Sequence, residues 1–224
     1  MPEKTLEKTL VIAGSSGGLG EALQTRFSAG GYHVVPVSRH GAGHVHADLS
    51  DARATAELFQ SLDASKPLAG VIHNAMQFHR AAFLDTTPEV FEQVWRSMTL
   101  TAVNVAQQAV PRLRANGGGS LIFSGASGSL RAGPLFSAFS SAKFALRGLA
   151  QSLAREHSSE GIHVAHTILD GLIWSDKTQQ RFDGAQETSS MAAADLAEVY
   201  WQLFHQAPSA WTHELDLRPM SAKV

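Results

Sequence analysis

Short apolar runs rich in β-branched residues alternate along this chain with longer stretches in which apolar residues recur at helical spacing. The short runs predict buried strands at residues 9–14, 33–38, 44–49, 69–75, 120–125, 162–169 and 213–217. The longer stretches predict helices at 20–31, 51–62 with Ser50 as its cap, 87–114, 134–158 and 193–206. Strands that alternate with helices form βαβ units, so the pattern predicts an α/β fold with a doubly wound parallel sheet in a three-layer α/β/α arrangement.

Length and composition fit one soluble domain. The 224 residues suit a single α/β domain spanning 1–224, without repeat, linker or low-complexity segment. A net charge of -2 gives no electrostatic attraction to nucleic acid or to anionic membranes. The N-terminal residues 1–9 are polar, and the apolar run after them is too short for a signal peptide or a membrane span, so we expect a cytoplasmic protein. There is no cysteine, and the eleven histidines form no HExxH arrangement, so we expect no metal site.

The first strand runs directly into a glycine-rich turn, "AGSSGGLGEAL", that opens a helix. The turn supplies the candidate residues Gly14, Ser15, Ser16, Gly18, Leu19 and Gly20. Glycine lets the backbone approach a pyrophosphate closely, and the helix N-terminus supplies N–H groups and a positive dipole. The succession of strand, turn and helix therefore predicts a dinucleotide-binding site rather than a merely tight turn.

The spacing Gly-x3-Gly-x-Gly resembles that of the short-chain dehydrogenase/reductase family, and the resemblance extends over essentially the whole chain. It implies a Rossmann-type fold, a nicotinamide cofactor, a small-molecule substrate and oxidoreductase activity. Family members distinguish NAD from NADP at the end of the second strand, which here carries Ser38 and Arg39. No carboxylate at these positions repels a 2′-phosphate, and a guanidinium suits one, so we expect NADP rather than NAD.

The resemblance implies further cofactor contacts in three motifs, at Asp48 and Leu49, at Asn74 and Ala75, and at Gly171 and Ser175. The first pair matches the family's adenine contact, and the second matches the Asn-Ala-Gly that follows the fourth strand. The third lies in "DGLIWS", which resembles Pro-Gly-x-x-x-Thr beside the nicotinamide. Asp170 replaces the proline there, whereas Ser175 retains a hydroxyl able to bind the carboxamide.

The catalytic positions implied by the resemblance depart from the family. A tyrosine protonates the carbonyl oxygen in that family, a lysine four residues later lowers the tyrosine pKa and binds the ribose, and a serine and an asparagine assist. The corresponding positions here are Phe139, Lys143, Ala126 and Thr99, so only Lys143 keeps the family residue. Phenylalanine has no proton to give, and general acid catalysis typically contributes ~10²–10⁴-fold. We therefore expect carbonyl and alcohol interconversion to be severely impaired, with Lys143 still binding the nicotinamide ribose.

Several groups are candidates for a replacement acid. His73 and His79 flank the end of the fourth strand, and histidine titrates near neutrality. A hydroxyl of Tyr32 or Tyr200 reaching the nicotinamide would overturn this interpretation. The serines near Phe139 are explained more simply as polar groups of helix and loop: Ser127, Ser129, Ser137, Ser140 and Ser141. Two hypotheses remain, an NADP-dependent oxidoreductase of atypical or very weak activity and a catalytically silent NADP-binding sensor or partner subunit.

Other segments bear on the site and on assembly. "PSAWTHELDLRP" and the segment around Phe139 resemble a bacterial subgroup of the family in which phenylalanine occupies the tyrosine position. Family members pair through two long helices, here 87–114 and 134–158, so a homodimer or homotetramer is expected. Residues 175–192 are polar and irregular and are a candidate lid, and Trp174 and Phe182 indicate a partly apolar pocket.

Overall fold

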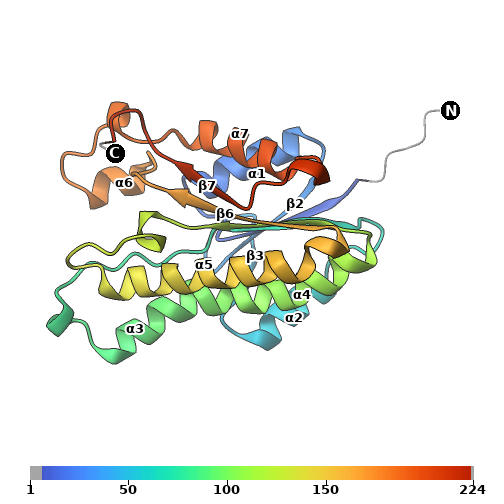
Figure 1. Cartoon of the computed structure of the whole chain (residues 1–224), viewed down its shortest axis with the longest axis horizontal. Helices are drawn as coiled ribbons and strands as arrows, with labels where there is room; N and C mark the ends of the chain where they lie inside the picture. Colours follow the sequence, from blue (N-terminus) through green and yellow to red (C-terminus); the bar gives the residue numbers. More distant parts are fainter. Residues whose placement is uncertain (1–6, 223–224) are drawn as a thin grey trace.

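The computed structural model describes residues 7–222 apart from the side chain of Lys177, so the N-terminal residues 1–6 lie outside it. The described chain forms a seven-stranded parallel sheet in the order β3-β2-β1-β4-β5-β6-β7 (Figure 1). The strands are β1 Thr9–Ala13, β2 His33–Ser38, β3 Val45–His46, β4 Leu68–His73, β5 Gly119–Ser124, β6 Ile162–Leu169 and β7 Glu214–Leu217. The helices are α1 Leu19–Ala29, α2 Ala52–Gln60, α3 Pro88–Trp95, α4 Thr101–Ala115, α5 Ser137–His157, α6 Asp176–Arg181 and α7 Ala193–Phe204.

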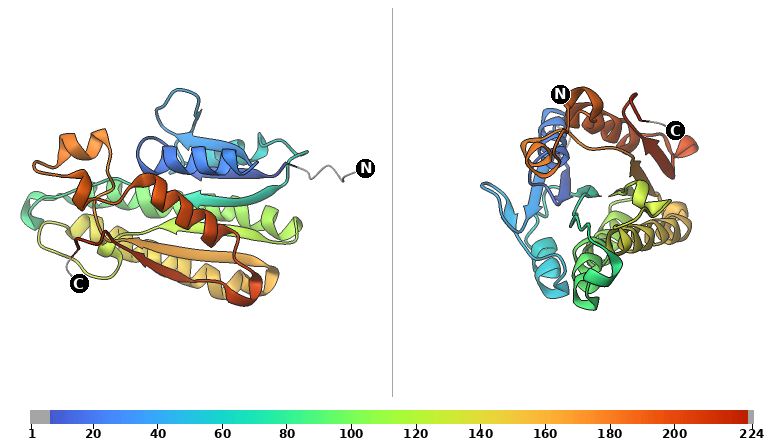
Figure 2. Two further views of the ribbon diagram at one scale, coloured as in Figure 1. Left: turned by 90° about the horizontal axis from the view of Figure 1, so that it is seen from above. Right: turned by 90° about the vertical axis from the view of Figure 1, so that its left-hand side faces the viewer.

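Two helix layers cover the sheet, with α1 and α7 on one face and α2, α4 and α5 on the other (Figures 1 and 2). Strand β1 shows why the sequence demands this arrangement. Leu10 and Ile12 join the core cluster on the α1 and α7 face, whereas Val11 and Ala13 join the opposite cluster. Successive strand residues point to opposite faces, so a continuous apolar run requires cover on both. The predicted doubly wound parallel sheet is confirmed.

Strand β2 contains Pro36, which cannot donate a hydrogen bond to a sheet ladder. Pro36 lies opposite Ile12 of β1, and β3 pairs only with Val37 and Ser38. The proline therefore occupies a part of β2 that has a neighbour on one side. The predicted strand at 44–49 is correspondingly short, because only Val45 and His46 pair.

The predicted helix at 87–114 is not continuous. A π-helical turn at Arg96–Leu100 separates α3 from α4. Thr99 lies in this turn, is buried, and donates its hydroxyl proton to the carbonyl oxygen of Ala142 at 3.0 Å. The turn thereby attaches the α3–α4 segment to α5 one residue before Lys143.

Two further local expectations need correction or refinement. The cap of α2 is Asp51 rather than Ser50, because the Asp51 carboxylate accepts from the backbone N–H groups of Arg53 and Ala54. The segment 175–192 contains helix α6, capped by Ser175, and a short 3-10 turn at Glu187–Ser189. In the part of the chain that is described, no helix is long and apolar enough to cross a membrane.

Candidate cofactor and active site

The glycine turn after β1 is tightly packed against neighbouring backbone. Gly14 has φ +81°, and a Cβ built on it would lie 2.5 Å from the backbone of Ala75. A Cβ on Gly20 would lie 2.5 Å from the backbone of Ser15. The Asn74 side chain donates to the Gly14 carbonyl at 3.0 Å and joins the ends of β1 and β4. Side chains at these two glycines would force the turn apart, so the turn has the close packing typical of a phosphate-binding loop.

Gly18 opens the space in front of α1. It has φ +47°, and a Cβ there would point toward Ser175, 3.7 Å away across the cavity. Among the described residues no side chain caps the N-terminus of α1. The Glu21 carboxylate accepts from the Gly17 amide at 3.0 Å, and the Gly20 amide donates to the Gly17 carbonyl at 3.0 Å. The Leu19 amide and the positive dipole of the helix are what this N-terminus offers to an anion.

Two adjoining cavities, of about 460 Å³ and about 920 Å³, run from this turn along the carboxyl ends of the strands. Both include Gly14, Ser16 and Arg39 in their walls. The smaller one also contains the predicted residues Ser38, Asp48, Leu49 and Ala75. The larger one contains Gly18, Leu19, Asn74, Ala126, Phe139, Lys143, Gly171 and Ser175. Most of the predicted site residues thus share one continuous region.

Three predicted residues lie outside the walls of these cavities. Thr99 faces α5, and Gly20 packs against Ser15. Ser15 is fully buried, and its hydroxyl donates to the Val37 carbonyl at 3.0 Å. Thr99, Gly20 and Ser15 therefore contact the elements that carry the cavity walls rather than the cavities themselves.

At the smaller cavity, the hydroxyl groups near β2 are engaged by the protein itself. Ser38 Oγ donates to the His40 carbonyl at 2.6 Å and contacts His44 Nδ1 at 2.8 Å. Arg39 is exposed beside it and has no ion-pair partner among residues 7–222. Hydrogen bonds from the Ser50 hydroxyl and amide lower the pKa of Asp48, which keeps its carboxylate ionised.

In the larger cavity Phe139 forms part of the wall, with Lys143 one helical turn further along α5. Phe139 is buried, and its ring centroid lies 5.8 Å from that of Phe78. Lys143 Nζ lies 5.8 Å from the Phe139 centroid and donates to the Ser124 carbonyl at 2.7 Å. Burial lowers the pKa of Lys143 to about 8. This ammonium can therefore lose or gain a proton near neutral pH.

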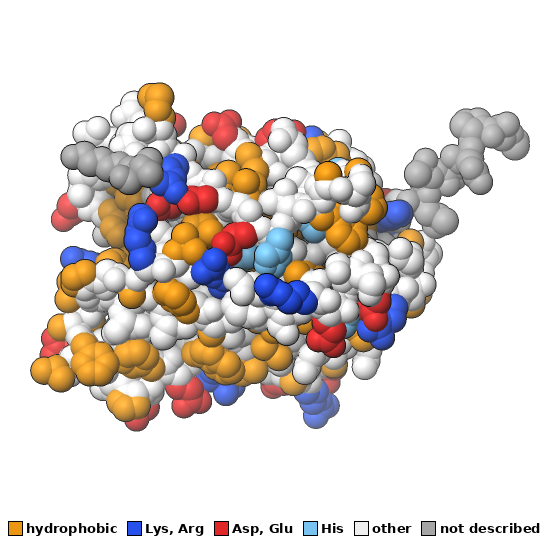
Figure 3. Space-filling view, in the orientation of Figure 1, with side chains coloured by type: hydrophobic (Ala, Val, Ile, Leu, Met, Phe, Trp, Pro, Cys, Tyr) orange, Lys and Arg blue, Asp and Glu red, His pale blue; other side chains and the backbone are white. Residues whose placement is uncertain are grey.

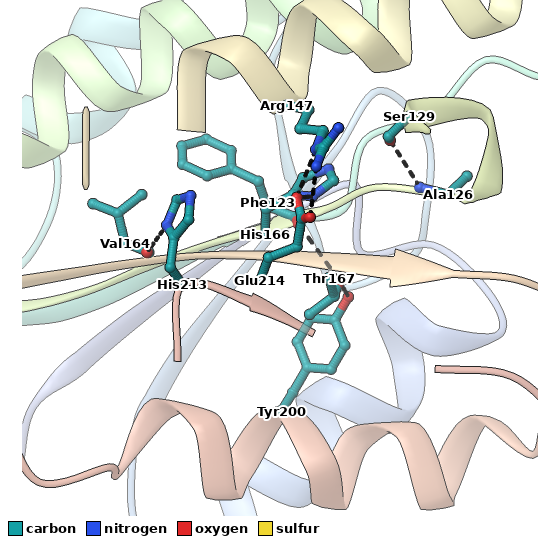
Figure 4. A network of polar contacts seen from close by, with 10 residues as sticks. All are labelled: Phe123, Ala126, Ser129, Arg147, Val164, His166, Thr167, Tyr200, His213 and Glu214. Carbon is teal, nitrogen blue, oxygen red and sulfur yellow. Dashed lines mark hydrogen bonds and ion pairs between the residues drawn. The ribbon is translucent and has the colours of Figure 1, made fainter. Parts of the chain in front are cut away.

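Neither tyrosine lies in the walls of the two cavities. Tyr200 comes from α7 on the opposite face of the sheet, where its hydroxyl contacts Thr167 Oγ1 at 2.5 Å (Figure 4). The same hydroxyl contacts Ser124 Oγ at 2.8 Å. Burial raises its pKa to about 12. The Tyr32 hydroxyl instead contacts His205 Nε2 at 2.9 Å. The phenol groups are thus engaged away from Phe139.

The two candidate histidines also have other partners. His73 is fully surrounded by protein, with Nε2 2.8 Å from Thr101 Oγ1. Burial, assisted by the charge of Lys143, lowers the pKa of His73 to about 3, so the ring is neutral at physiological pH. His79 Nε2 lies 3.3 Å from Thr86 Oγ1, and His79 is absent from the walls of both cavities. Geometry favours neither as the replacement acid.

The "THELDL" motif forms a polar network behind the site (Figure 4). Glu214 of β7 accepts two hydrogen bonds from Arg147 of α5, at 2.7 and 2.8 Å. The same carboxylate lies 3.2 Å from His166 Nδ1 on β6, and burial lowers the pKa of His166 to about 4. Arg147 follows Lys143 by one turn, so this network fixes α5 relative to the sheet at the level of the site.

Sequence analysis missed the aromatic and cationic residues at the far end of the larger cavity. Phe78, Phe136, Arg131 and Arg181 join the predicted Phe182 there, whereas Trp174 does not line the cavity. The only sequence signal that could have identified any of them was the position of Phe136, which precedes Phe139 by about one helical turn. Phe78 and Arg181 are brought together by tertiary structure alone.

Comparisons with known proteins agree with this architecture. A family model for short chain dehydrogenases matches residues 8–185. The 3-oxoacyl-(acyl-carrier-protein) reductase MabA of Mycobacterium tuberculosis is 29% identical over 182 residues, covering 78% of this chain and 72% of that protein. A short-chain dehydrogenase of Rhodopseudomonas palustris superposes with a TM-score of 0.81 at 32% identity, covering 95% of this chain and 98% of that one. An alcohol dehydrogenase of Thermococcus sibiricus, complexed with 5-hydroxy-NADP, has a TM-score of 0.85 at 19% identity over 97% of this chain and 99% of that one. With its glycine turn, parallel sheet and matching family model, the chain belongs to the short-chain dehydrogenase family.

Proposed function

We propose that this chain binds NADP(H) along the two adjoining cavities and acts as an oxidoreductase of atypical or very weak activity toward carbonyls and alcohols. The observation that carries the proposal is that Phe139 and Lys143 line the cavity onto which the glycine turn opens. NADP-bound relatives of similar fold support the choice of cofactor.

The residues present fit a dinucleotide. Gly18 has no side chain to fill the space in front of α1, where a pyrophosphate would meet the Leu19 amide and the positive end of the helix dipole. The exposed guanidinium of Arg39 suits a 2′-phosphate. Lys143 Nζ donates one of its three N–H groups to the Ser124 carbonyl, so two remain for ribose hydroxyls or a substrate oxygen. Ser175 is less free, because its hydroxyl already accepts from the Thr178 amide at 3.2 Å.

The chemistry then depends on where a proton is held. When bound, NADPH supplies a hydride to the carbonyl carbon of a substrate. Phe139 offers the carbonyl oxygen no hydrogen bond, and Ala126 supplies no hydroxyl. Lys143 can donate a proton from Nζ to that oxygen and then regain one from water. An ammonium that is already engaged by the Ser124 carbonyl, with Ala126 rather than a serine to orient the substrate, is a poorer donor than a preorganised phenol paired with a serine, so slow turnover is expected.

The presence of Phe139 in the wall of the larger cavity also favours a second candidate function, a silent NADP-binding sensor or partner subunit. The tyrosine hydroxyls and both candidate histidines are engaged elsewhere in the described chain, so binding without turnover also fits.

We also propose that residues 1–224 act as one domain and that it forms a homodimer or homotetramer through α3, α4 and α5. Hydrophobic side chains gather on the surface over α3 and α5 (Figure 3). Trp95 of α3 and Phe144 of α5 are 40% and 44% exposed, which is high for large apolar side chains. Light scattering of the purified protein should report two or four copies, and a monomer would contradict the assembly.

Both candidate functions require that the protein binds NADP(H). Titration of the purified protein with NADPH, followed by nicotinamide fluorescence, tests this. Saturable binding that is tighter for NADPH than for NADH is expected, and no binding would overturn both candidates. Adding a panel of aldehydes, ketones and quinones then separates them. Slow NADPH consumption with any member supports the oxidoreductase, whereas none at high protein concentration supports the silent protein.

A further inference from the structure

The far end of the larger cavity combines an aromatic surface with positive charge. Phe78 lies at its centre, with ring centroids 5.8 Å from Phe136, 5.8 Å from Phe139 and 5.3 Å from Phe182. These residues come from the segment after β4, from α5 and its preceding loop, and from the end of α6. Rings at such distances form a continuous apolar wall that suits a flat or conjugated body.

Arginine side chains accompany these rings. The guanidinium carbon of Arg181 lies 5.5 Å over the Phe78 ring, and that of Arg80 lies 5.9 Å over the Phe136 ring. A guanidinium at this distance over an aromatic face is attracted by the ring and keeps N–H groups available for a planar anion. Arg181 also lines the cavity itself.

The cavity carries an excess of positive charge. Its walls contain four cationic side chains, those of Arg39, Arg131, Lys143 and Arg181, and one carboxylate, that of Asp170. Asp170 is already engaged, since Arg131 lies 3.1 Å from it and Arg218 lies 4.0 Å from it. Within residues 7–222, no carboxylate forms an ion pair with Arg181.

In the proposed function, two of the four cationic side chains bind the cofactor: Arg39 binds the 2′-phosphate and Lys143 binds the ribose. Arg181 is accounted for neither by the cofactor nor by a carboxylate of the described chain. It lies against the aromatic wall, where the substrate body would be expected.

We propose, on the basis of the function proposed above, that the substrate class is an aryl or otherwise conjugated carbonyl compound carrying a carboxylate. The aromatic body packs among Phe78, Phe136 and Phe182, and the carboxylate pairs with Arg181. Carboxylate and guanidinium match in shape and form two parallel hydrogen bonds. Neutral carbonyl compounds of the same size lack this contact and bind more weakly.

Calorimetric titration with two probes tests this independently of turnover. The probes are 3-phenylpropanoate and its neutral isostere 3-phenylpropanamide, each added to the protein alone and to the protein saturated with NADP⁺. The carboxylate is expected to bind about tenfold or more tightly than the amide, which is ordinary for a charge-assisted hydrogen bond. Equal affinities would overturn the proposal.

Variants assign the preference to a residue. Arg181→Gln should abolish the preference for the carboxylate and leave NADPH affinity unchanged. Arg53→Gln is the matched control, because Arg53 lies on the surface of α2 and pairs with Glu57. A preference that survives Arg181→Gln, or NADPH affinity that falls with it, would overturn the assignment. If NADPH itself fails to bind wild-type protein, the proposed function fails, while the probe pair still decides the anion site on the protein alone.

Discussion

Lys143 Nζ lies 5.8 Å from the centre of the Phe139 ring, and the two residues share one face of α5 at the wall of the larger cavity. The ammonium is buried and is held by the Ser124 carbonyl. In the proposed assignment, Lys143 is the lysine of the family and Phe139 stands where its tyrosine would be, so the group whose pKa the lysine would lower has no hydroxyl. This pair and the glycine turn on which the cavities open determine how variants of the protein should behave.

Substitution of Gly14 by alanine should damage the cofactor turn. The new Cβ would lie 2.5 Å from the backbone of Ala75, at a φ of +81° that L side chains rarely adopt. The strain should cost about 1–3 kcal/mol of unfolding free energy and weaken NADPH binding. Gly148→Ala is the control, because nothing lies within 4 Å of its Cβ on α5. That change should be neutral or stabilise by about 0.5–1 kcal/mol, as measured by denaturant unfolding.

Removal of the Arg39 charge should reduce discrimination between cofactors. Arg39→Gln is expected to weaken NADPH binding about tenfold or more, since a hydrogen bond to a charged group is lost, and to affect NADH less. Fluorescence titration with both cofactors measures the ratio of affinities. Unchanged NADPH affinity would show that the 2′-phosphate lies elsewhere.

The rate of carbonyl reduction should depend on the protonation of Lys143. Its pKa is lowered by burial to about 8, so the proton-donating ammonium predominates below that pH and is lost above it. Residual reduction should therefore decrease as pH rises through about 8, as measured by product formation at saturating NADPH. Lys143→Met should remove both this dependence and the activity. A rate that rises through this range would identify a different proton source.

Acid should destabilise the protein through His73. Burial lowers the pKa of this histidine from its ordinary value of 6.5 to about 3 in the folded chain, so the unfolded chain takes up a proton first as pH falls below 6.5. Neutral His73 makes its full contribution to the free energy of unfolding above pH 6.5, and up to about 3 kcal/mol of that free energy is lost between pH 6.5 and 4. Urea unfolding at several pH values should show a shallower loss for His73→Leu. His46→Gln, at an exposed histidine, should keep the wild-type slope.

The sequence was sufficient to predict the sheet and to select residues that mostly line one pair of adjoining cavities, because both depend on local pattern. The apolar run of β1 requires cover on two faces, and the glycines of the following turn are needed where backbones meet. The π-helical turn at Thr99 was not predicted, since an inserted residue changes the phase of a helix without changing its composition. The cap of α2 was assigned one residue early because Ser50 and Asp51 are both good caps.

The residues at the far end of the larger cavity could not be predicted from sequence pattern. Phe78 and Arg181 are far apart along the chain, and neither belongs to a motif. Their contact arises only because α6 packs over the segment that follows β4. The engagement of Tyr200 and His73 away from Phe139 depends likewise on tertiary contacts with Thr167 and Thr101.

The central claim is that the cofactor site is intact and that the customary proton donor is missing. The most direct measurement compares NADPH-dependent ketone reduction by wild-type protein with that of the double variant Phe139→Tyr and Ala126→Ser, after NADPH affinity has been matched for both. A gain of at least about 10²-fold in the variant, with cofactor affinity unchanged, is the predicted result. Equal rates for two proteins that bind NADPH equally well would contradict it.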